Sequence, residues 1–276
     1  MTYIEDKLLL ATKKWKLTDL NAIYKQSNRA VFSAKSACYG DVILKLNSVT
    51  KELSSEYGML ERMKGVCCCK VYEYDSENGM FLEEKILPGM KLRDETDVNL
   101  RIMNFVTVFQ KIHREVTTRS TFDTYMDWLE RTCRTLQYIP NEAMLGQKMM
   151  LAREIGQELF GKYTDRVLLH GDLHHDNMLL TQTGDYVIID PKGVIGPAIF
   201  DIPRYLLNEI DAKVNETKKE HIQYVISRIS DYLGYPVEDI QKLFFMEVVL
   251  GNSWCVESGE EPNLLHIQLA VEILQD

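Results

Sequence analysis

A few polar side chains in this sequence have the types and the spacing that transfer of a phosphoryl group requires. Such a transfer needs a carboxylate for the proton of the acceptor hydroxyl, oxygen ligands for Mg²⁺, and a cation on the remaining phosphates. Asp172 and Asn177 stand in the string HGDLHHDN with the spacing D-x-x-x-x-N. Asp190 ends an apolar run that begins at Val187, and a carboxylate there suits a hard cation such as Mg²⁺.

The cation of this set is Lys45, in the alternating string VILKL that predicts a strand. Glu56, on a predicted helix that follows, is its natural ion-pair partner. Each residue alone is weak evidence for such a site, because Asp and Asn are common turn residues and Lys45 could protect an edge strand from pairing with another chain. Their order along the chain matches the parts of a kinase site, so the combination predicts a phosphotransferase.

Other reactive side chains fit plainer interpretations. His174 and His175 could bind a metal, but no third ligand follows at a matching spacing, so we interpret them as supports of the loop. Cys67–Cys69 are adjacent and therefore poorly placed to pair, and no zinc-type spacing occurs. We expect reduced, buried thiols.

The elements that must position these residues change in character along the chain. The first part is expected to be β-rich, up to the breakers at Leu87–Gly89. Its predicted elements are a helix within 1–20, strands Ala22–Tyr24, Ala30–Lys35 and Val42–Leu46, a helix over 53–63, and strands Cys67–Tyr74 and Gly79–Lys85.

The second part is expected to be mainly helical, with a short β-rich insert around the HGDLHHDN string. Its predicted elements are helices Leu100–Val116, Phe122–Leu136 and Glu142–Tyr163, strands Val167–Leu169, Met178–Leu180 and Tyr186–Ile189, and helices from Pro203 to the end. The sequence thus predicts an α+β, bilobal fold, with a nucleotide-binding lobe over 1–86, a catalytic and acceptor-binding lobe over 87–276 and a hinge at about 82–89.

Composition excludes several classes of protein. The 276 residues carry a formal net charge of −9, which argues against a nucleic-acid partner. No apolar run reaches the roughly 18 residues that a transmembrane helix needs, so we expect no membrane partner. The N-terminal stretch is charged and lacks the features of a secretory leader, so we expect a cytoplasmic protein.

The strings HGDLHHDN and IDPKGVIG resemble those of the aminoglycoside/hydroxyurea antibiotic-resistance kinases, the streptomycin 6-phosphotransferase-like branch of the aminoglycoside phosphotransferase and choline kinase group. The resemblance extends over nearly the whole chain, including LKL at 44–46, LPG at 87–89 and DWL at 127–129. It implies a protein-kinase-like fold and ATP-dependent phosphorylation of a hydroxyl on a small molecule.

The resemblance also implies roles for the chemical residues. Asp172 would be the catalytic base, and Asn177 and Asp190 the magnesium ligands. Lys45 would hold the α- and β-phosphates of ATP, oriented by Glu56.

Further residues follow from the same resemblance. The adenine would lie along Leu82–Ile86, near the backbone of Glu84 and Ile86. Ser27, Asn28 and Arg29 would form the turn over the phosphates, although that turn is not rich in glycine. Asp201 would support the catalytic loop. Pro197 stands where the family usually has an acidic residue, which bears on the preference for the acceptor.

The acceptor is less well defined by the sequence. Residues 243–276 contain no Lys or Arg but six acids, Glu247, Glu257, Glu260, Glu261, Glu272 and Asp276. They could attract a cationic acceptor such as an aminoglycoside or an amino sugar, or simply form a solvated surface. Trp254 and Glu257 are the candidate substrate residues, and Trp128 is a further aromatic candidate that could equally belong to the core. The alternatives are a metabolite kinase for choline, ethanolamine, homoserine or a sugar, and a non-catalytic nucleotide-binding protein.

Overall fold

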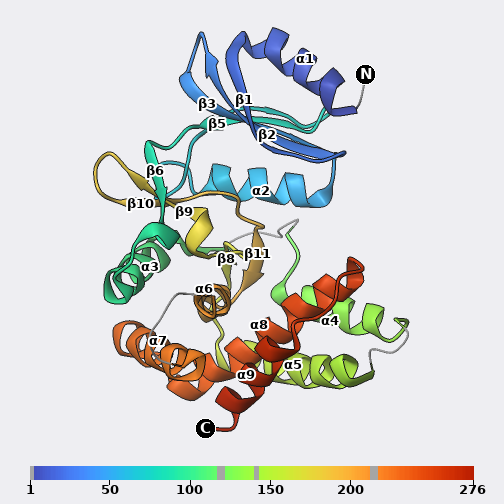
Figure 1. Cartoon of the computed structure of the whole chain (residues 1–276), viewed down its shortest axis with the longest axis vertical. Helices are drawn as coiled ribbons and strands as arrows, with labels where there is room; N and C mark the ends of the chain where they lie inside the picture. Colours follow the sequence, from blue (N-terminus) through green and yellow to red (C-terminus); the bar gives the residue numbers. More distant parts are fainter. Residues whose placement is uncertain (1–2, 117–121, 140–142, 212–216) are drawn as a thin grey trace. The chain divides into compact units, whose positions relative to one another are not determined.

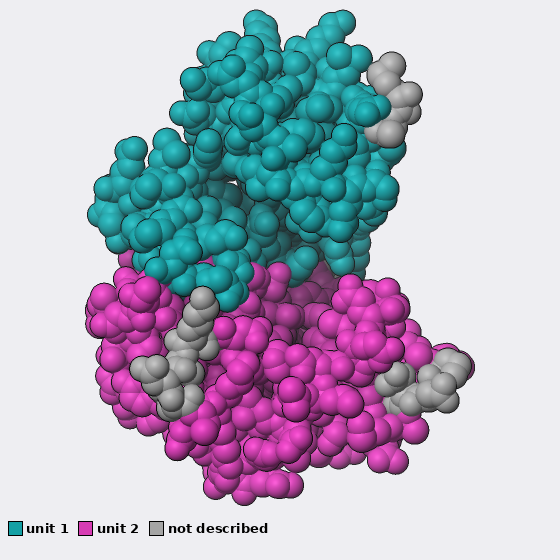
Figure 2. Space-filling view, viewed as in Figure 1, with its two compact units in different colours: residues 1–94, 176–193 teal, residues 95–175, 194–276 magenta. Residues whose placement is uncertain are grey.

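A computed structural model of the protein describes residues 3–116, 122–139, 143–211 and 217–276, and the chain divides into two units. Unit 1 comprises Met1–Asp94 and Asp176–Gly193, and unit 2 comprises Glu95–His175 and Val194–Asp276 (Figure 2). These boundaries differ from the predicted lobes 1–86 and 87–276, because residues 176–193 pack with the N-terminal part of the chain.

A five-stranded antiparallel sheet forms the body of unit 1, in the order β1-β2-β3-β5-β4. Helix α1 packs on one face of the sheet and α2 lies on the other (Figure 1), with Ile4, Ala11 and Trp15 of α1 in the core beside Leu44. The bounds are α1 Tyr3–Trp15, β1 Leu17–Lys25, β2 Arg29–Ser36, β3 Gly40–Asn47, α2 Lys51–Arg62, β4 Val71–Asp75 and β5 Met80–Glu84.

The first predicted helix is too long at its C-terminal end. Helix α1 ends at Trp15, and β1 begins at Leu17 instead of near Ala22. The residue between them, Lys16, has a φ of 52°, in the left-handed region that turns the chain out of a helix.

A second, smaller sheet completes unit 1, with the order β10-β9-β6. Its strands are β6 Pro88–Lys91, β9 Met178–Thr181 and β10 Tyr186–Ile188, and the short helix η1 (Leu92–Asp94) follows β6. The sequence predicted that β structure stops at the Leu87–Gly89 breakers, which is wrong for Pro88. A proline is tolerated as the first residue of an edge strand, which is its place in β6.

Unit 2 is mainly helical. Its helices are α3 Val98–Ile112, α4 Tyr125–Leu136, α5 Ala143–Lys162, α6 Ile202–Glu209, α7 Lys218–Leu233, α8 Val237–Glu257 and α9 Leu264–Leu274, with the short helix η3 Ala198–Asp201. Helix α8 packs against α4, α5, α6, α7 and α9, and it is buried over most of its length. Residues 243–250 of α8 are all buried, as expected of a helix that passes through a core.

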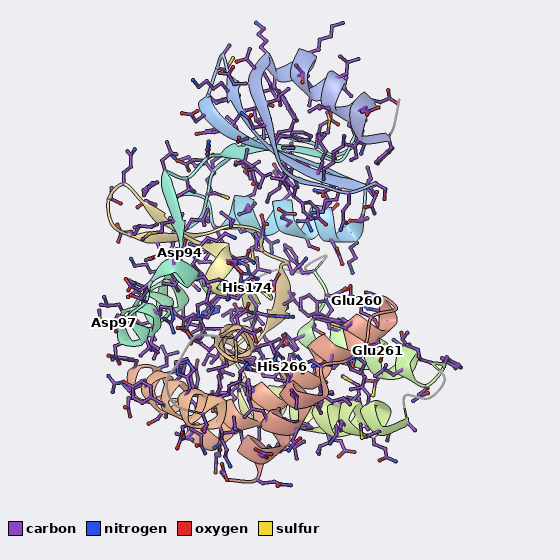
Figure 3. All side chains as sticks on the ribbon, in the orientation of Figure 1. Asp94, Asp97, His174, Glu260, Glu261 and His266 are labelled. Carbon is purple, nitrogen blue, oxygen red and sulfur yellow. The ribbon has the colours of Figure 1, made fainter. Side chains whose placement is uncertain are left out.

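Side-chain caps fix where several of these helices begin. Asp97 accepts hydrogen bonds from the amides of Asn99 and Leu100 at the start of α3 (Figure 3). Thr124 and Asp127 form a capping box, so α4 begins at Tyr125 rather than at the predicted Phe122.

Of two other predicted helix ends, one differs from the structure and one falls outside the described residues. The helix predicted over Leu100–Val116 ends at Ile112, because Arg114–Glu115 pair as β7 with β8 (Val167–Leu169). Glu142, the predicted start of the helix Glu142–Tyr163, lies outside the described residues. Strand β11 (Val194–Gly196) completes a small sheet in the order β11-β8-β7.

Within the described ranges, no helix combines the length and the apolar character that crossing a bilayer requires.

Candidate active site

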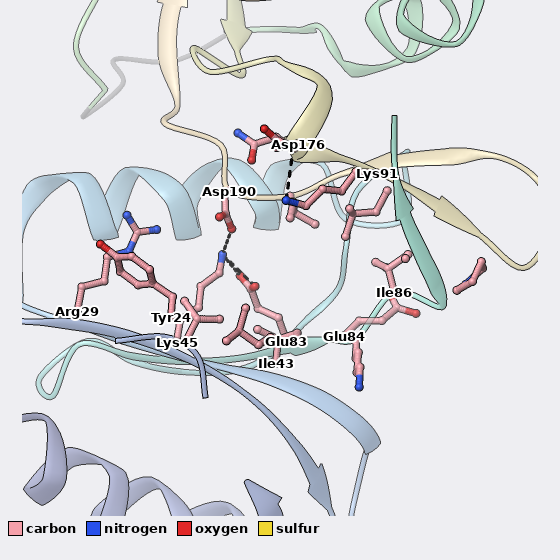
Figure 4. Close-up of a pocket in the computed structure, with 18 residues that line it drawn as sticks. Tyr24, Arg29, Ile43, Lys45, Glu83, Glu84, Ile86, Lys91, Asp176 and Asp190 are labelled. Carbon is pink, nitrogen blue, oxygen red and sulfur yellow. Dashed lines mark hydrogen bonds and ion pairs between the residues drawn. The ribbon is translucent and has the colours of Figure 1, made fainter. Parts of the chain in front are cut away.

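Lys45 lies at the centre of an ionic cluster in unit 1. It belongs to β3, between β2 and β5, and the residue is 3% exposed. Its Nζ donates to Glu56 Oε1 of α2 at 2.6 Å and lies 3.0 Å from Glu83 Oε2 of β5. It is also ion-paired with Asp190 (Figure 4). The predicted partnership of Lys45 and Glu56 is therefore present.

The cluster holds more negative than positive charge. Burial alone would lower the pKa of Lys45, but Asp190, Glu56 and Glu83 together raise it well above its usual value. Burial raises the pKa of Glu83 to about 7, and the neighbouring carboxylates of Glu56 and Asp190 add to that rise. One ammonium faces three carboxylates, so the cluster can accommodate further positive charge.

Glu83 is a residue that sequence reasoning missed. It lies in the apolar strand β5, directly after Met80, Phe81 and Leu82, and it is 2% exposed. A carboxylate is rarely buried unless it has a partner. An acid placed directly after three apolar strand residues was the available signal for a functional residue.

A cavity of about 620 Å³ opens beside Lys45 within unit 1 (Figure 4). This volume is within the usual range for a small-ligand site. Apolar side chains of β2, β3 and β9, together with Ile23 and Ile189, line part of it. Cations and acids line the rest, among them Lys91 and Asp176, which form an ion pair at 3.4 Å.

Most of the predicted cofactor residues line this cavity. They are Arg29, Lys45, Glu84, Ile86, Asn177 and Asp190. Ser27 and Asn28, which the resemblance placed over the phosphates, are exposed and are not among its lining residues. The strands on either side of this turn line the cavity instead, through Tyr24 of β1 and Arg29 of β2.

The two predicted magnesium ligands come from neighbouring strand ends. Asn177 precedes β9, Asp190 follows β10, and the amide of Ile189 donates to the carbonyl of Asn177 at 3.0 Å. Asp190 has a φ of 56°, a left-handed conformation that non-glycine residues seldom adopt outside constrained sites. A carboxylate and an amide oxygen are hard ligands of the kind that Mg²⁺ prefers.

The loop that carries Asp172 is held inside unit 2. The amides of His170 and Gly171 donate to the two carboxylate oxygens of Asp201, each at 2.8 Å. Asp201 is 1% exposed and also contacts His113 Nε2 at 3.0 Å. Asp201 thus makes the supporting contact that the resemblance implied.

The carboxylate of Asp172 is partly exposed and has basic neighbours. Its Oδ1 lies 3.4 Å from Arg204 Nε and 3.6 Å from His174 Nε2 (His174 is labelled in Figure 3). The same guanidinium lies 2.7 Å from Glu247 Oε1 through its Nη2. Sequence reasoning gave no role to Arg204 and placed Glu247 only in a general acidic surface.

A model of one protein family matches this chain over residues 14–259, that of the aminoglycoside/hydroxyurea antibiotic resistance kinases. The chain belongs to that family. It is therefore a kinase, a phosphotransferase with an alcohol group as acceptor, as the sequence predicted. No curated protein sequence matches the chain.

Solved structures share the fold of this kinase at low sequence identity. The choline kinase LicA from Streptococcus pneumoniae is 17% identical, with a TM-score of 0.71 and 99% of each chain covered. The aminoglycoside phosphotransferase APH(4)-Ia is 13% identical, with a TM-score of 0.69 and coverage of 99% of this chain and 98% of that one. The amicoumacin kinase hAmiN is 15% identical, with a TM-score of 0.69 and coverage of 98% and 93%. These likenesses confirm the predicted α+β, protein-kinase-like fold.

The predicted acceptor residues of this kinase, Trp254 and Glu257, lie at the C-terminal end of α8. Trp254 Nε1 donates to Thr132 Oγ1 at 3.0 Å, and its ring lies edge-on to Trp128 at 5.7 Å between centroids. The guanidinium of Arg204 lies 5.5 Å from the Trp254 ring centroid, which connects Trp254 to the surroundings of Asp172. Burial raises the pKa of Glu257, opposed by Arg131.

The acids of the C-terminal segment have different partners, so they do not act as one group. Glu247 is 2% exposed and ion-paired. Asp276 pairs with Lys219 at 2.7 Å. Glu260 and Glu261 are exposed after the end of α8 (Figure 3). Only Glu247 of these four contacts a residue that touches Asp172.

A second ionic cluster of this kinase surrounds Glu209, which is 0% exposed. Arg101 donates to both of its carboxylate oxygens, at 2.9 and 3.0 Å. His175 Nε2 and His221 Nε2 each lie 2.7 Å from one oxygen. Burial would raise the pKa of Glu209, but the hydrogen bonds from these partners hold it far below its usual value. The interpretation of His175 as a loop support fits this arrangement.

Proposed function

We propose that this kinase transfers the γ-phosphoryl group of Mg-ATP to a hydroxyl of a small cationic acceptor, an aminoglycoside of the streptomycin type or an amino sugar. The observation that carries the proposal is the buried ammonium of Lys45, which is held between Glu56 and Asp190 beside a cavity of nucleotide size. The family of the chain supports the antibiotic as acceptor. Cytoplasm, where ATP is available, remains the predicted location.

The residues of the cavity fit ATP and Mg²⁺ by their chemistry. Asp190 and Asn177 would hold the metal ion, which would neutralise charge on the phosphates as the bond to the leaving group breaks. Lys45 would bind the α- and β-phosphates, and the ion pair with Glu56 would keep its side chain extended toward them. Arg29 also lines the cavity and adds a further cation. Glu84 and Ile86 remain the proposed contacts of the adenine.

We assign the role of base to Asp172. Its carboxylate would accept the proton of the acceptor hydroxyl as that oxygen attacks the γ-phosphorus. The new P–O bond then forms on the acceptor, the bond to the β-phosphate oxygen breaks, and ADP leaves with the electron pair. Asp201, which binds the backbone at His170 and Gly171, would fix the position of Asp172 along the loop.

The test is release of ADP from Mg-ATP across a panel of acceptors: streptomycin, a second aminoglycoside, choline, ethanolamine, homoserine and simple sugars. Asp172→Asn should lower kcat by about 10²- to 10⁴-fold, the usual contribution of a general base. Its affinity for Mg-ATP should change little. The matched control is Asp231→Asn on the surface of α7, which should leave turnover unchanged.

Each outcome of the panel has a definite meaning. Turnover of streptomycin that is lost in Asp172→Asn supports the proposal in full. Turnover of a metabolite alone would keep the phosphotransferase and replace the acceptor. Binding of Mg-ATP without turnover of any compound would contradict the proposed acceptors and favour a nucleotide-binding role. Equal loss of ATP binding and turnover in Asp172→Asn would contradict the role of base.

A further inference from the structure

Arg204 of α6 lies between two carboxylates that are far apart in the sequence. Its Nε is 3.4 Å from Asp172 Oδ1, and its Nη2 is 2.7 Å from Glu247 Oε1. All three residues belong to unit 2. The exposed fraction of the side chain rises in order from 2% at Glu247 to 17% at Arg204 and 24% at Asp172. The contacts therefore run from the core outward to the proposed base.

The guanidinium is fixed on its inner side. Glu247 is itself held by the hydroxyl of Tyr125, which donates to its other oxygen. The ring of Trp254 lies 5.5 Å from the guanidinium carbon, and Trp254 is held in turn by its hydrogen bond to Thr132. Burial lowers the pKa of Arg204, but Glu247 and then Asp172 raise it above its usual value, so the side chain remains charged.

Neutralising Arg204 requires only one buried carboxylate, and Glu247 supplies it. A planar guanidinium whose position is already set by Glu247 and Trp254 offers a fixed positive charge to a second carboxylate, with which it forms an ion pair. The last torsion angle of Asp is broad, so the contacts of its carboxylate influence its direction, and Oδ1 of Asp172 lies near both Arg204 and His174. An ion pair at Oδ1 would restrict rotation about that angle and so influence which oxygen faces the acceptor.

We propose that Arg204 is a positioning residue for Asp172, and that Glu247 in α8 holds Arg204 in the orientation this requires. The inference rests on the proposed function, because it gives Arg204 a role only through the base. Arg204 takes no proton and forms no bond in the reaction. It sets the direction of the carboxylate that accepts the proton from the acceptor hydroxyl.

The experiment compares Arg204→Gln and Arg204→Lys with the matched control Arg228→Gln on the surface of α7. The acceptors are the panel compound with the highest turnover and, beside it, water, measured as ATP hydrolysis without an acceptor. We expect Arg204→Gln to lower kcat about 10- to 100-fold, since small misplacements of a catalytic group are costly. The KM for Mg-ATP should stay within about threefold of the wild-type value. Arg204→Lys should recover part of the loss of kcat, because an ammonium keeps the positive charge but lacks the planar geometry of a guanidinium.

A double-mutant cycle separates positioning from general structure. In an Asp172→Asn background, Arg204→Gln should cost less than about threefold in residual turnover, because residues that act as a unit are not additive. A purely structural role predicts the same loss in both backgrounds and would overturn the inference. An increase in the acceptor KM at unchanged kcat would also overturn it, since Arg204 would then bind the acceptor directly.

Glu247→Gln provides a second approach if Arg204→Gln does not fold. It keeps the shape of the buried side chain and weakens its hold on Arg204, so we expect the same pattern with a smaller loss of kcat. An unchanged kcat in a folded Glu247→Gln protein would contradict the inference. Failure of the proposed function looks different, because it appears as an inactive wild type or a fully active Asp172→Asn, and the inference then fails with it.

Discussion

The two buried ionic clusters of this kinase have central charges of opposite sign. In unit 1 one ammonium, Lys45, holds three carboxylates. In unit 2 one carboxylate, Glu209, holds a guanidinium and two imidazole rings. Both centres are almost fully buried, at 3% and 0% exposure. Burial and ion pairing alone therefore do not distinguish a ligand site from a structural support.

The clusters differ in how completely they are closed. Both oxygens of Glu209 receive two contacts each, all from the chain itself. Around Lys45 the charges do not balance, Glu83 has a pKa of about 7, and Asp190 is 32% exposed at a cavity. A closed cluster holds segments of the chain together, whereas an open one can exchange a partner for a ligand. We expect mutations to separate these two roles.

The largest expected effect is on stability, at Glu209. Glu209→Gln leaves Arg101 buried without its counter-charge, and breaking a buried pair in this way costs about 3–5 kcal/mol in the free energy of unfolding. Denaturant titration followed by circular dichroism measures the change. The matched control, Glu158→Gln, removes only an exposed partner of Lys242 and should cost less than about 1 kcal/mol. Equal stability of the two variants would contradict the structural role.

The next effect is on nucleotide use, at Lys45. Lys45→Ala should lower kcat/KM for Mg-ATP by about 10²- to 10³-fold, the usual cost of removing a group that stabilises charge in the transition state. Lys35→Ala, on the neighbouring strand β2 and 61% exposed, is the control and should leave kcat/KM unchanged. If Lys45→Ala changed only the stability of the protein, the two clusters would have the same role after all.

The smallest effect is the pH dependence of stability that comes from Glu83. Its pKa in the folded protein is about 7, against an ordinary value of 4.5, so unfolding releases a proton between these two values. The stability that the protonated form provides is therefore complete below about pH 4.5 and is lost as the pH rises through about 7.

Glu83→Gln removes this titration. The variant should be more stable than the wild type by about 1–3 kcal/mol at pH 8, and the difference should fall toward zero at pH 5. Thermal unfolding at both pH values measures it, with Glu77→Gln in an exposed turn as the control. A gain that is the same at pH 5 and pH 8 would mean that Glu83 does not titrate in this window.

Local patterns in the sequence predicted much of the site. Lys45 in an alternating strand, Glu56 on the next helix and Asp190 at a strand end are each visible in a few neighbouring residues, and the three meet in the structure. The limits of local reasoning appear where conformation overrides pattern. Lys16 ends α1 before the apolar pattern does, and Pro88 begins a strand where a break was expected.

The remaining site residues depend on contacts between distant parts of the chain. The position of Arg204 between Asp172 and Glu247 results from the packing of α6 and α8, so it cannot be recognised from neighbouring residues in the sequence. Glu209 likewise can be recognised as the centre of an ionic cluster only from its contact with Arg101, more than a hundred residues away in the sequence. The spacing of residues in a single sequence does not predict contacts between such distant side chains. Glu83 is the exception, since an acid that directly follows three apolar strand residues is a local signal.

Unit 1 is assembled from two separate stretches of chain, 1–94 and 176–193, and this has a consequence for inheritance and engineering. A gene fragment that encodes only the first stretch keeps Lys45, Glu56 and Glu83 but omits Asn177 and Asp190. One recombination event between related genes therefore cannot exchange this unit whole, because its second stretch follows the first stretch of unit 2 in the reading frame. Two crossovers, near residues 94 and 176, and a third near 193 would be required. The residues that line the cavity therefore lie on both sides of Asp172 in the reading frame.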